Sequence, residues 1–174
     1  MTSEERRKEI LVFLTVKHEP TSASAIASKF GVSRQVIVGD IALLRAAGED
    51  IVATPRGYVV ESGTPTAAVT KTIACIHNDD RLKEELYTVV DLGGGLVDVT
   101  VEHPVYGYIS AKLHIYSRYD ADEFCKKLSE RSAPPLSMLT GGIHLHTLTC
   151  PSNEALERIL IALHQKGFLL NEIS

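Results

Sequence analysis

The stretch Phe30-Gly31-Val32-Ser33 restricts the fold of this chain more than any other part of its sequence. Glycine adopts a left-handed backbone at no steric cost, so Gly31 favours the end of a helix. Ser33 is a strong helix N-cap, because its side chain accepts a hydrogen bond from a free backbone amide of the first turn. The sequence therefore predicts two helices joined by a tight turn at residues 31–33.

Apolar residues at helical spacing predict three helices around this turn. The first extends from Glu4 to about His18, the second follows Thr21 and Ser22 as N-caps, and the third begins at Ser33 and ends at Gly48. The expected apolar positions are Ile10, Leu11, Phe13 and Leu14 in the first helix, Ala25, Ile26, Ala27 and Phe30 in the second, and Val36, Ile37, Ile41, Leu43 and Leu44 in the third.

A β-hairpin is expected next, because two β-prone segments, residues 51–53 and 57–60, flank Pro55-Arg56. Helix, short helix, turn, long helix and hairpin in this order resemble the winged helix-turn-helix domain at the N-termini of many bacterial repressors. The resemblance is carried by Ile26-Ala27, Phe30-Gly31-Val32-Ser33-Arg34, Ile41-Ala42-Leu43-Leu44-Arg45, Ile51 and Gly57-Tyr58. It implies that double-stranded operator DNA is a partner and that the third helix enters the major groove.

The first turn of the third helix carries Ser33, Arg34 and Gln35. Arginine and glutamine suit bidentate contacts with the edges of guanine and adenine. Arg56 at the tip of the hairpin is expected to reach a phosphate or the minor groove, and Lys29 and Arg45 are weaker phosphate candidates. The alternative is a small helical interaction domain whose arginines are only solvated.

Charge divides the chain into two parts. The net charge of −4 by itself argues weakly against a nucleic-acid partner, but residues 1–60 carry +1 and residues 61–174 carry −5. Residues 61–70 are rich in Gly, Pro, Ser and Thr, which is typical of a boundary between domains. We therefore expect a DNA-binding domain at residues 1–61, a linker at 62–70 and a second domain at 71–174.

The sequence points to the cytoplasm. No apolar run approaches the ~20 residues that span a membrane. The first residues include Glu4, Glu5 and Glu9 and precede no small-residue cleavage site, so no signal peptide is expected. The three cysteines, Cys75, Cys125 and Cys150, are an odd number and are expected to be buried thiols rather than disulfides.

The second domain alternates β and α signals. Strands are expected at residues 71–77, 96–102, 108–116, 143–149 and 168–170, and helices at 79–90, 119–130 and 152–165. Gly93-Gly94-Gly95 is expected to form a turn rather than a phosphate loop, because no Lys-Ser/Thr follows it. The expected fold class is α+β: the winged helix-turn-helix domain is followed by an α/β sandwich with a mostly antiparallel sheet.

Histidines in the second domain suggest a metal site. His144 and His146 are two apart in an expected strand, so both imidazoles project from one face. His77 lies where a strand gives way to a helix, and Glu85 lies about two turns along that helix on roughly the same side. Three imidazoles and a carboxylate suit nickel, zinc, iron or manganese. The alternative is a pair of surface or hydrogen-bonded histidines.

Two neighbours of this set remain open. Cys75 is two residues before His77 and could face the site as a soft ligand, although simple burial is the preferred interpretation. Glu84 is the alternative carboxylate if Glu85 points away from the histidines.

Across nearly its whole length the chain resembles the niacin-responsive transcriptional repressors, whose C-terminal module is the three-histidine domain. The resemblance is carried by His77 with Glu84-Glu85-Leu86, by Asp91-Leu92-Gly93-Gly94, by His103-Pro104-Val105-Tyr106-Gly107 and by Gly142-Ile143-His144-Leu145-His146-Thr147. It implies a divalent metal, nickel or zinc first, held by His77, Glu85, His144 and His146. It also implies nicotinic acid as co-repressor at operators of niacin uptake and NAD synthesis genes.

Further expectations follow from this resemblance. His103 and Tyr106 are expected to bind the ligand or orient the site, the alternative for His103 being a turn histidine bonded to the backbone. A homodimer is expected, because palindromic operators match two-fold proteins, with the C-terminal sheet carrying the contact. The chain is expected not to be an enzyme. The alternatives are a regulator that senses only a metal or an amino acid, and a metal-dependent enzyme with a DNA-binding head.

Overall fold

The computed structural model describes residues 1–61 and 68–170. The chain forms two compact units, one on either side of residues 62–67. The expected linker at 62–70 lies partly outside the described residues, and its last two residues, Val69 and Thr70, belong to a strand instead. They pair with Cys150 and Thr149 on the neighbouring strand, which extends the sheet further toward the N-terminus than the sequence predicted.

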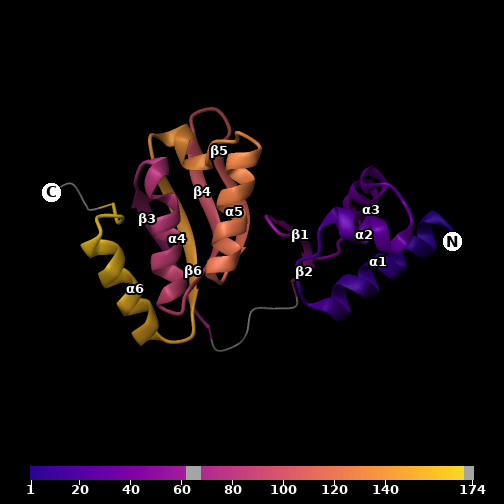
Figure 1. Ribbon diagram of the computed structural model, residues 1–174, viewed down its shortest axis with the longest axis horizontal. Coiled ribbons are helices and arrows are strands. Elements are labelled where there is room, and N and C mark those ends of the chain that lie inside the picture. Colours follow the sequence, from indigo (N-terminus) through magenta and orange to yellow (C-terminus); the bar gives the residue numbers. More distant parts are fainter. Residues whose placement is uncertain (62–67, 171–174) are drawn as a thin grey trace. The chain divides into compact units, whose positions relative to one another are not determined.

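The first unit contains three helices and a two-stranded antiparallel hairpin (Figure 1). The elements are α1 (Ser3–Lys17), α2 (Ala23–Phe30), α3 (Arg34–Ala46), β1 (Ile51–Thr54) and β2 (Gly57–Val60). The side chains of Thr2, Ser22 and Ser33 each accept a hydrogen bond from an amide in the first turn of the helix that follows. Gly31 has a φ of 66°, so its left-handed backbone ends α2 as expected.

The core of this unit differs from the predicted pattern on α3. Its buried face consists of Ile37, Asp40, Ile41 and Leu44, spaced three and four residues apart. Val36 and Leu43, which were expected in the core, are 37% and 56% exposed because they fall outside this stripe. The expected core position Ala25 on α2 is also exposed.

The buried carboxylate of Asp40 ties α3 to α1. Arg6 donates from Nε to Asp40 Oδ2 at 2.6 Å, and Arg7 Nη1 lies 3.6 Å from Oδ1. The sequence did not single out this charge, because a lone aspartate in a helix normally faces solvent. Its ion pairs join this face of α3 to α1.

The hairpin is attached to the start of α2. Thr21 and Tyr58 exchange two backbone hydrogen bonds of 2.8 and 2.9 Å. Gly57 has a φ of 132°, and a Cβ there would lie 2.3 Å from the backbone carbon of Thr21. Only glycine permits this close approach between hairpin and helix.

The second unit is a four-stranded antiparallel sheet with helices packed on it (Figure 1). Its strands are β3 (Val69–Ile76), β4 (Gly95–His103), β5 (Gly107–Ile115) and β6 (Ile143–Cys150), in the order β3-β6-β4-β5. Its helices are α4 (Leu82–Asp91), α5 (Arg118–Glu130) and α6 (Asn153–Gln165), with 3-10 helices η1 (Asp79–Arg81) and η2 (Leu136–Thr140). The expected α+β class is confirmed, and β6 lies between β3 and β4 although it is the last strand in sequence.

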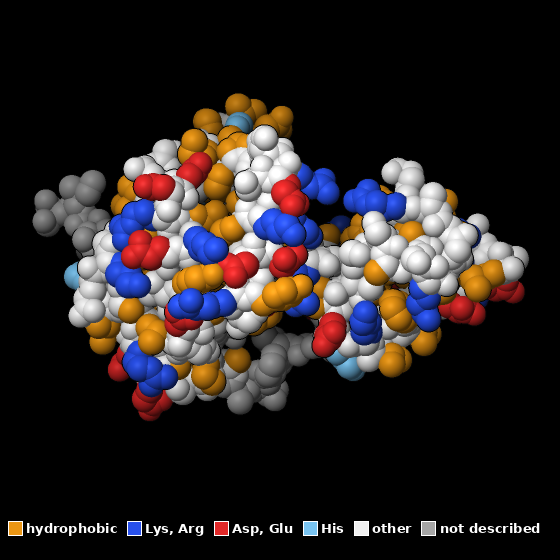
Figure 2. All heavy atoms as spheres, in the orientation of Figure 1, with side chains coloured by type: hydrophobic (Ala, Val, Ile, Leu, Met, Phe, Trp, Pro, Cys, Tyr) orange, Lys and Arg blue, Asp and Glu red, His pale blue; other side chains and the backbone are white. Residues whose placement is uncertain are grey.

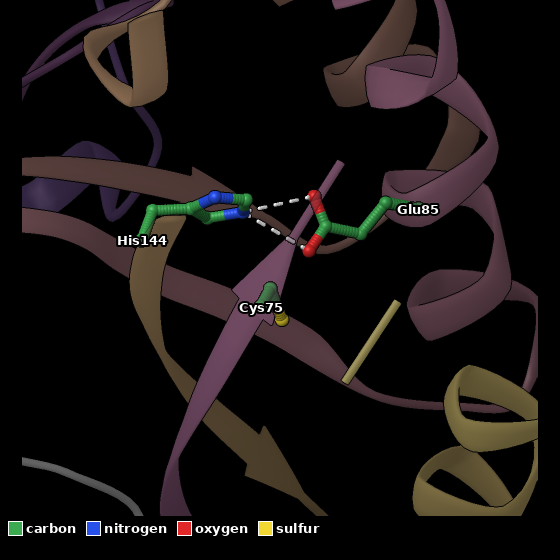
Figure 3. A group of neighbouring side chains, drawn as sticks. All are labelled: Cys75, Glu85 and His144. Carbon is green, nitrogen blue, oxygen red and sulfur yellow. Dashed lines mark hydrogen bonds and ion pairs between the residues drawn. The ribbon is translucent and has the colours of Figure 1, made fainter. Parts of the chain in front are cut away.

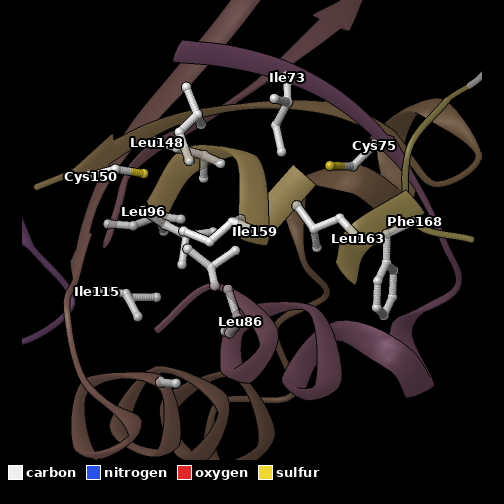
Figure 4. Close-up of a cluster of buried hydrophobic side chains, with 14 of the residues drawn as sticks. Ile73, Cys75, Leu86, Leu96, Ile115, Leu148, Cys150, Ile159, Leu163 and Phe168 are labelled. Atoms are coloured by element: carbon white, nitrogen blue, oxygen red, sulfur yellow. The ribbon is translucent and has the colours of Figure 1, made fainter. Parts of the chain in front are cut away.

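One hydrophobic core joins the sheet to its helices (Figure 4). Leu96 and Leu148 from the sheet meet Leu86 from α4 and Ile159 from α6, and all four are fully buried. Burial of each such side chain contributes about 1.5–3 kcal/mol. All three cysteines are free thiols, and Cys75 and Cys150 are buried in this core.

The helical face of the second unit carries charges of both signs, which Figure 2 shows interspersed over the surface. Arg118 pairs with Asp91, and Lys83 pairs with Asp122. All four side chains are partly exposed, so each pair contributes at most about 1 kcal/mol.

The segment after α6 completes the sheet. Ile76 donates its backbone N–H to Phe168 at 2.9 Å, and Leu170 donates to Ala74 at 2.9 Å, so residues 168–170 lie beside β3 as a short strand-like segment. Among the described helices, none has the length and apolar character to cross a bilayer.

Candidate metal centre

The site begins with the two histidines on β6. His144 and His146 alternate with Ile143 and Leu145, so both imidazoles lie on the face of the sheet that the helices cover. Each residue is only 2% exposed. β6 is an interior strand, with β3 on one side and β4 on the other.

Glu85 and His77 complete the cluster from other elements. Glu85 projects from α4 and is fully buried, while His77 follows the last residue of β3 and is 8% exposed. The Glu85 carboxylate lies 2.5 Å from His77 Nε2, 3.2 Å from His144 Nε2 and 3.6 Å from His146 Nε2. Three ring nitrogens therefore converge on one buried carboxylate.

The other ring nitrogen of each histidine bonds to a backbone carbonyl. His77 Nδ1 lies 2.7 Å from the Asn78 oxygen, His144 Nδ1 lies 2.8 Å from the Gly142 oxygen, and His146 Nδ1 lies 2.7 Å from the Asp98 oxygen. A carbonyl can only accept, so each Nδ1 must carry the hydrogen. In the neutral rings, Nε2 then carries no hydrogen and presents a lone pair.

Lone pairs directed at a carboxylate repel one another unless a cation lies among them. His146 Nε2 is buried and has no hydrogen-bond partner among the described residues, and the Glu85 oxygen that faces it lies 3.6 Å away. Either protons on the imidazoles or a metal ion would supply the missing positive charge. Hydrogen bonds from metal-binding histidines to backbone carbonyls orient the rings in just this way.

The pKa values of Glu85 and of the histidines reflect two opposing effects, burial and the attraction between carboxylate and imidazoles. Burial opposes ionisation of Glu85, but the three imidazoles outweigh it and hold the pKa of this carboxyl well below its usual range. Burial also opposes charging of His77 and His146, yet the Glu85 carboxylate raises the pKa of both rings. The cluster thus keeps Glu85 anionic and attracts positive charge.

A β-bulge positions His146. The register of β4 against β6 shifts between Leu96, which pairs with Leu148, and Asp98, which pairs with Thr147. Val97 is the extra residue of this bulge. The Asp98 carbonyl accepts from His146 Nδ1, and its carboxylate accepts from the Thr147 backbone N–H at 3.0 Å. Neither the bulge nor the role of Asp98 could be read from the sequence pattern.

Gly142 positions the other two histidines. Its carbonyl accepts from His144 Nδ1 at 2.8 Å and from the His77 backbone N–H at 3.4 Å. Its φ is 95°, and a Cβ there would lie 2.5 Å from the His77 oxygen. The Gly142-Ile143-His144 sequence signal therefore has a physical basis in this close contact.

The neighbouring candidates lie as follows. Glu84 is partly exposed and pairs with Arg81, so it is not part of the cluster. His103 Nδ1 accepts from the backbone amides of Val105 and Tyr106 at 3.1 and 3.2 Å, and its ring packs against Tyr106. These are the contacts of a turn histidine, in the β4–β5 hairpin. Tyr106 is 78% exposed at the tip of that hairpin.

Beside the cluster, a cavity of about 450 Å³ is bordered by His77, Asn78, Asp79, Asp80, Met138, Gly141 and Gly142. His77 is the member of the cluster that faces it.

The predicted DNA-contacting residues lie at the surface of the first unit. Ser33 caps α3, Arg34 and Gln35 are exposed in its first turn, and Arg45 is exposed in its last turn. Arg56 is half-buried in the turn between β1 and β2. The exposed Val36 was missed as a surface residue because its apolar side chain suggested burial, yet apolar groups at such positions contact the thymine methyl.

A winged-helix fold joined to a second unit that encloses a buried polar site defines a class of two-domain DNA-binding proteins. Comparison with known families agrees: an HTH domain model matches residues 6–59, and a 3H domain model matches residues 70–172.

Full-length relatives make the assignment more specific. The chain is 45% identical over 169 residues to the probable transcription repressor NiaR of Thermotoga maritima, covering 97% of this chain and 95% of the relative. It is 39% identical over 169 residues to the transcription repressor NadR of Bacillus subtilis, covering 96% and 94%. The chain belongs to this 3H-domain family of transcription repressors and is a regulator rather than an enzyme.

Proposed function

We propose that this repressor acts in the cytoplasm as a niacin-responsive homodimer, with a divalent transition metal held by His77, Glu85, His144 and His146. The observation that carries the proposal is the convergence of three Nε2 atoms on buried Glu85, with His146 Nε2 lacking a partner. Nitrogen and carboxylate donors suit nickel or zinc first, and iron or manganese also accept them. When bound, the ion would act as an electrophilic centre for a ligand.

The chemical groups of nicotinic acid suit a ligand that enters the cavity beside His77 and binds the metal. It is a small planar molecule with a pyridine nitrogen and a carboxylate, both of which are metal-binding groups. Asp79 and Asp80 border the cavity, so an anion that enters it would be held there by a direct bond to the metal ion. The resemblance to niacin-responsive repressors supports this effector over a metal-only or amino-acid sensor.

DNA binding is assigned to α3 and the hairpin. We expect Arg34 and Gln35 to read base edges, and Arg45 and Arg56 to contact phosphates. A two-fold dimer would present two such helices to a palindromic operator, with the C-terminal sheet as the expected contact.

The test is operator binding measured by fluorescence anisotropy, with DNA from upstream of the gene itself and with metal-loaded protein. Nicotinic acid should tighten binding at least tenfold, which corresponds to about 1.4 kcal/mol of coupling. His144→Ala should lose this increase but keep binding without effector. Tight binding that nicotinic acid leaves unchanged would favour the metal-only sensor.

A further inference from the structure

We propose that the thiolate of Cys75 is a further protein ligand of the metal in this centre and that, together with Glu85, it neutralises the charge of the ion. The inference rests on the proposed metal centre and extends its set of ligands by one soft donor.

The fold places Cys75 beside the histidines. Cys75 on β3 pairs directly with His144 on β6, and both side chains lie on the covered face of the sheet. The residues paired with His146 are Ile73 on β3 and Val99 on β4, which offer no donor atom. Among these cross-strand neighbours, Cys75 therefore provides the donor.

The distances are suitable for a shared ion. Cys75 Sγ, a carboxylate oxygen of Glu85 and a ring nitrogen of His144 all lie within 4.8 Å of one another. Figure 3 shows His144 and Glu85 facing each other from β6 and α4, with Cys75 beside them on β3. Zinc–sulfur and zinc–nitrogen bonds of about 2.3 and 2.1 Å place two donors of one ion roughly 3.5 Å apart. Small side-chain rotations would bring the three donors to that separation.

Charge provides the second argument. Three neutral imidazoles and one carboxylate would leave a divalent ion with one uncompensated positive charge, and an unpaired charge in a buried site is costly. Cys75 is fully buried, as is Glu85. Binding of the ion by Cys75 would replace the S–H bond with a metal–sulfur bond and release the proton to solvent, and the thiolate and Glu85 would then balance the charge of the ion.

A separate observation points to a cation at this cluster: His146 Nε2 is buried without a hydrogen-bond partner among the described residues, and the Glu85 carboxylate oxygen lies 3.6 Å from it. A thiolate among the donors favours zinc, nickel or cobalt over manganese, which prefers oxygen ligands.

The experiment is a titration of the full-length, metal-free protein with Co²⁺, followed by absorption spectroscopy. Visible d–d bands report cobalt in the site, and near-ultraviolet sulfur-to-cobalt charge transfer reports a thiolate ligand. We expect both signals in the wild type and in Cys150→Ser, a matched control in the same core. Cys75→Ser should keep the d–d bands and lose the charge transfer.

A variant with a single thiol assigns the band even if Cys75→Ser fails to fold. In Cys125→Ser/Cys150→Ser, Cys75 is the remaining cysteine of three, so charge transfer in this variant assigns the band to Cys75. Charge transfer that persists in Cys75→Ser, or d–d bands without charge transfer in the wild type, would overturn the inference and leave the metal centre standing. A protein that binds no cobalt would overturn both.

Selectivity gives a second readout. Loss of groups that merely orient ligands already costs about 10- to 100-fold in metal affinity, so loss of a direct ligand should cost at least as much for Zn²⁺. The affinity for Mn²⁺ should change less in the same variant. Equal changes for the two metals would contradict a role for sulfur.

Discussion

The three histidines are held in place by backbone carbonyls rather than by other side chains. Asn78, Gly142 and Asp98 each accept a hydrogen bond from one imidazole Nδ1. The rings therefore present Nε2 to Glu85 without needing a metal to orient them, which would reduce the ordering cost of binding the proposed ion. At the residue scale, the proposed metal centre depends on the carbonyls that orient the three rings as well as on the rings and Glu85 themselves.

Replacement of His146 should remove stabilisation by metal. At a metal concentration 100-fold above Kd, binding stabilises the folded protein by about 2.7 kcal/mol. One kcal/mol raises Tm by about 4–8 °C in a domain of 60–100 residues. We expect thermal denaturation of the wild type and of the control His164→Gln, an exposed histidine on α6, to show this rise with Zn²⁺. His146→Gln should show little or none, and an undiminished rise would remove His146 from the ligand set.

Gly142→Ala should weaken the site without changing any ligand. The added Cβ would meet the His77 oxygen at 2.5 Å, whereas a Cβ on Gly141 would meet nothing within 4 Å. Both glycines have positive φ, so Gly141→Ala controls for backbone strain. Isothermal titration with Zn²⁺ should give about 10- to 100-fold weaker binding for Gly142→Ala than for Gly141→Ala. Equal affinities would show that this contact does not position His77.

At the element scale, α3 has two tasks on two faces. Ile37, Asp40, Ile41 and Leu44 fix it to the unit, with Asp40 clamped by Arg6. Arg34 and Gln35 remain exposed at its N-terminal end, where helices of this type meet bases. The buried face, apolar residues and ion pair together, determines which side chains the helix presents to solvent.

The two ends of α3 should respond differently to mutation. Arg34→Ala should cost about 1–3 kcal/mol of operator affinity and relax discrimination at one base pair. Arg45→Ala should weaken operator and unrelated DNA alike and reduce the salt slope of log K by about 1. Anisotropy titrations against operator and scrambled DNA at several salt concentrations distinguish these outcomes. Uniform loss for both variants would show that Arg34 contacts only phosphate.

At the scale of the whole molecule, charge and function are separated along the chain. Residues 1–60 carry a net +1 and residues 61–174 a net −5, so the positive charge that DNA attracts lies in the smaller unit. Under the proposed function, binding of metal and nicotinic acid to the second unit would change the affinity of the first unit for DNA. Metal and nicotinic acid must then both shift the equilibrium between a state of the protein that binds DNA tightly and one that binds it weakly.

Metal removal should therefore abolish the effector response and spare basal DNA binding. With a chelator, nicotinic acid should no longer tighten operator binding tenfold, and added Zn²⁺ or Ni²⁺ should restore the effect. Acidification should act in the same direction, because protons compete with the metal for the three Nε2 atoms. Anisotropy measured with and without chelator at two pH values tests this. A full nicotinic-acid response in chelator would separate the effector site from the metal.

The sequence alone determined the order of the helices and strands, and it determined which chemical groups, imidazoles and a carboxylate, are available to the candidate metal centre. Gly31 and Ser33 specify the turn between α2 and α3 through local backbone and capping preferences, and the His-x-His spacing places two imidazoles on one face of any strand. Such properties depend on residues close in the chain. The exposure of Val36 and Leu43, the pairing of Asp40 with Arg6, the bulge at Val97 and the register of Cys75 against His144 depend on partners far apart in sequence. Only tertiary packing decided them, because helix rotation and strand register are fixed by which distant surfaces bury together.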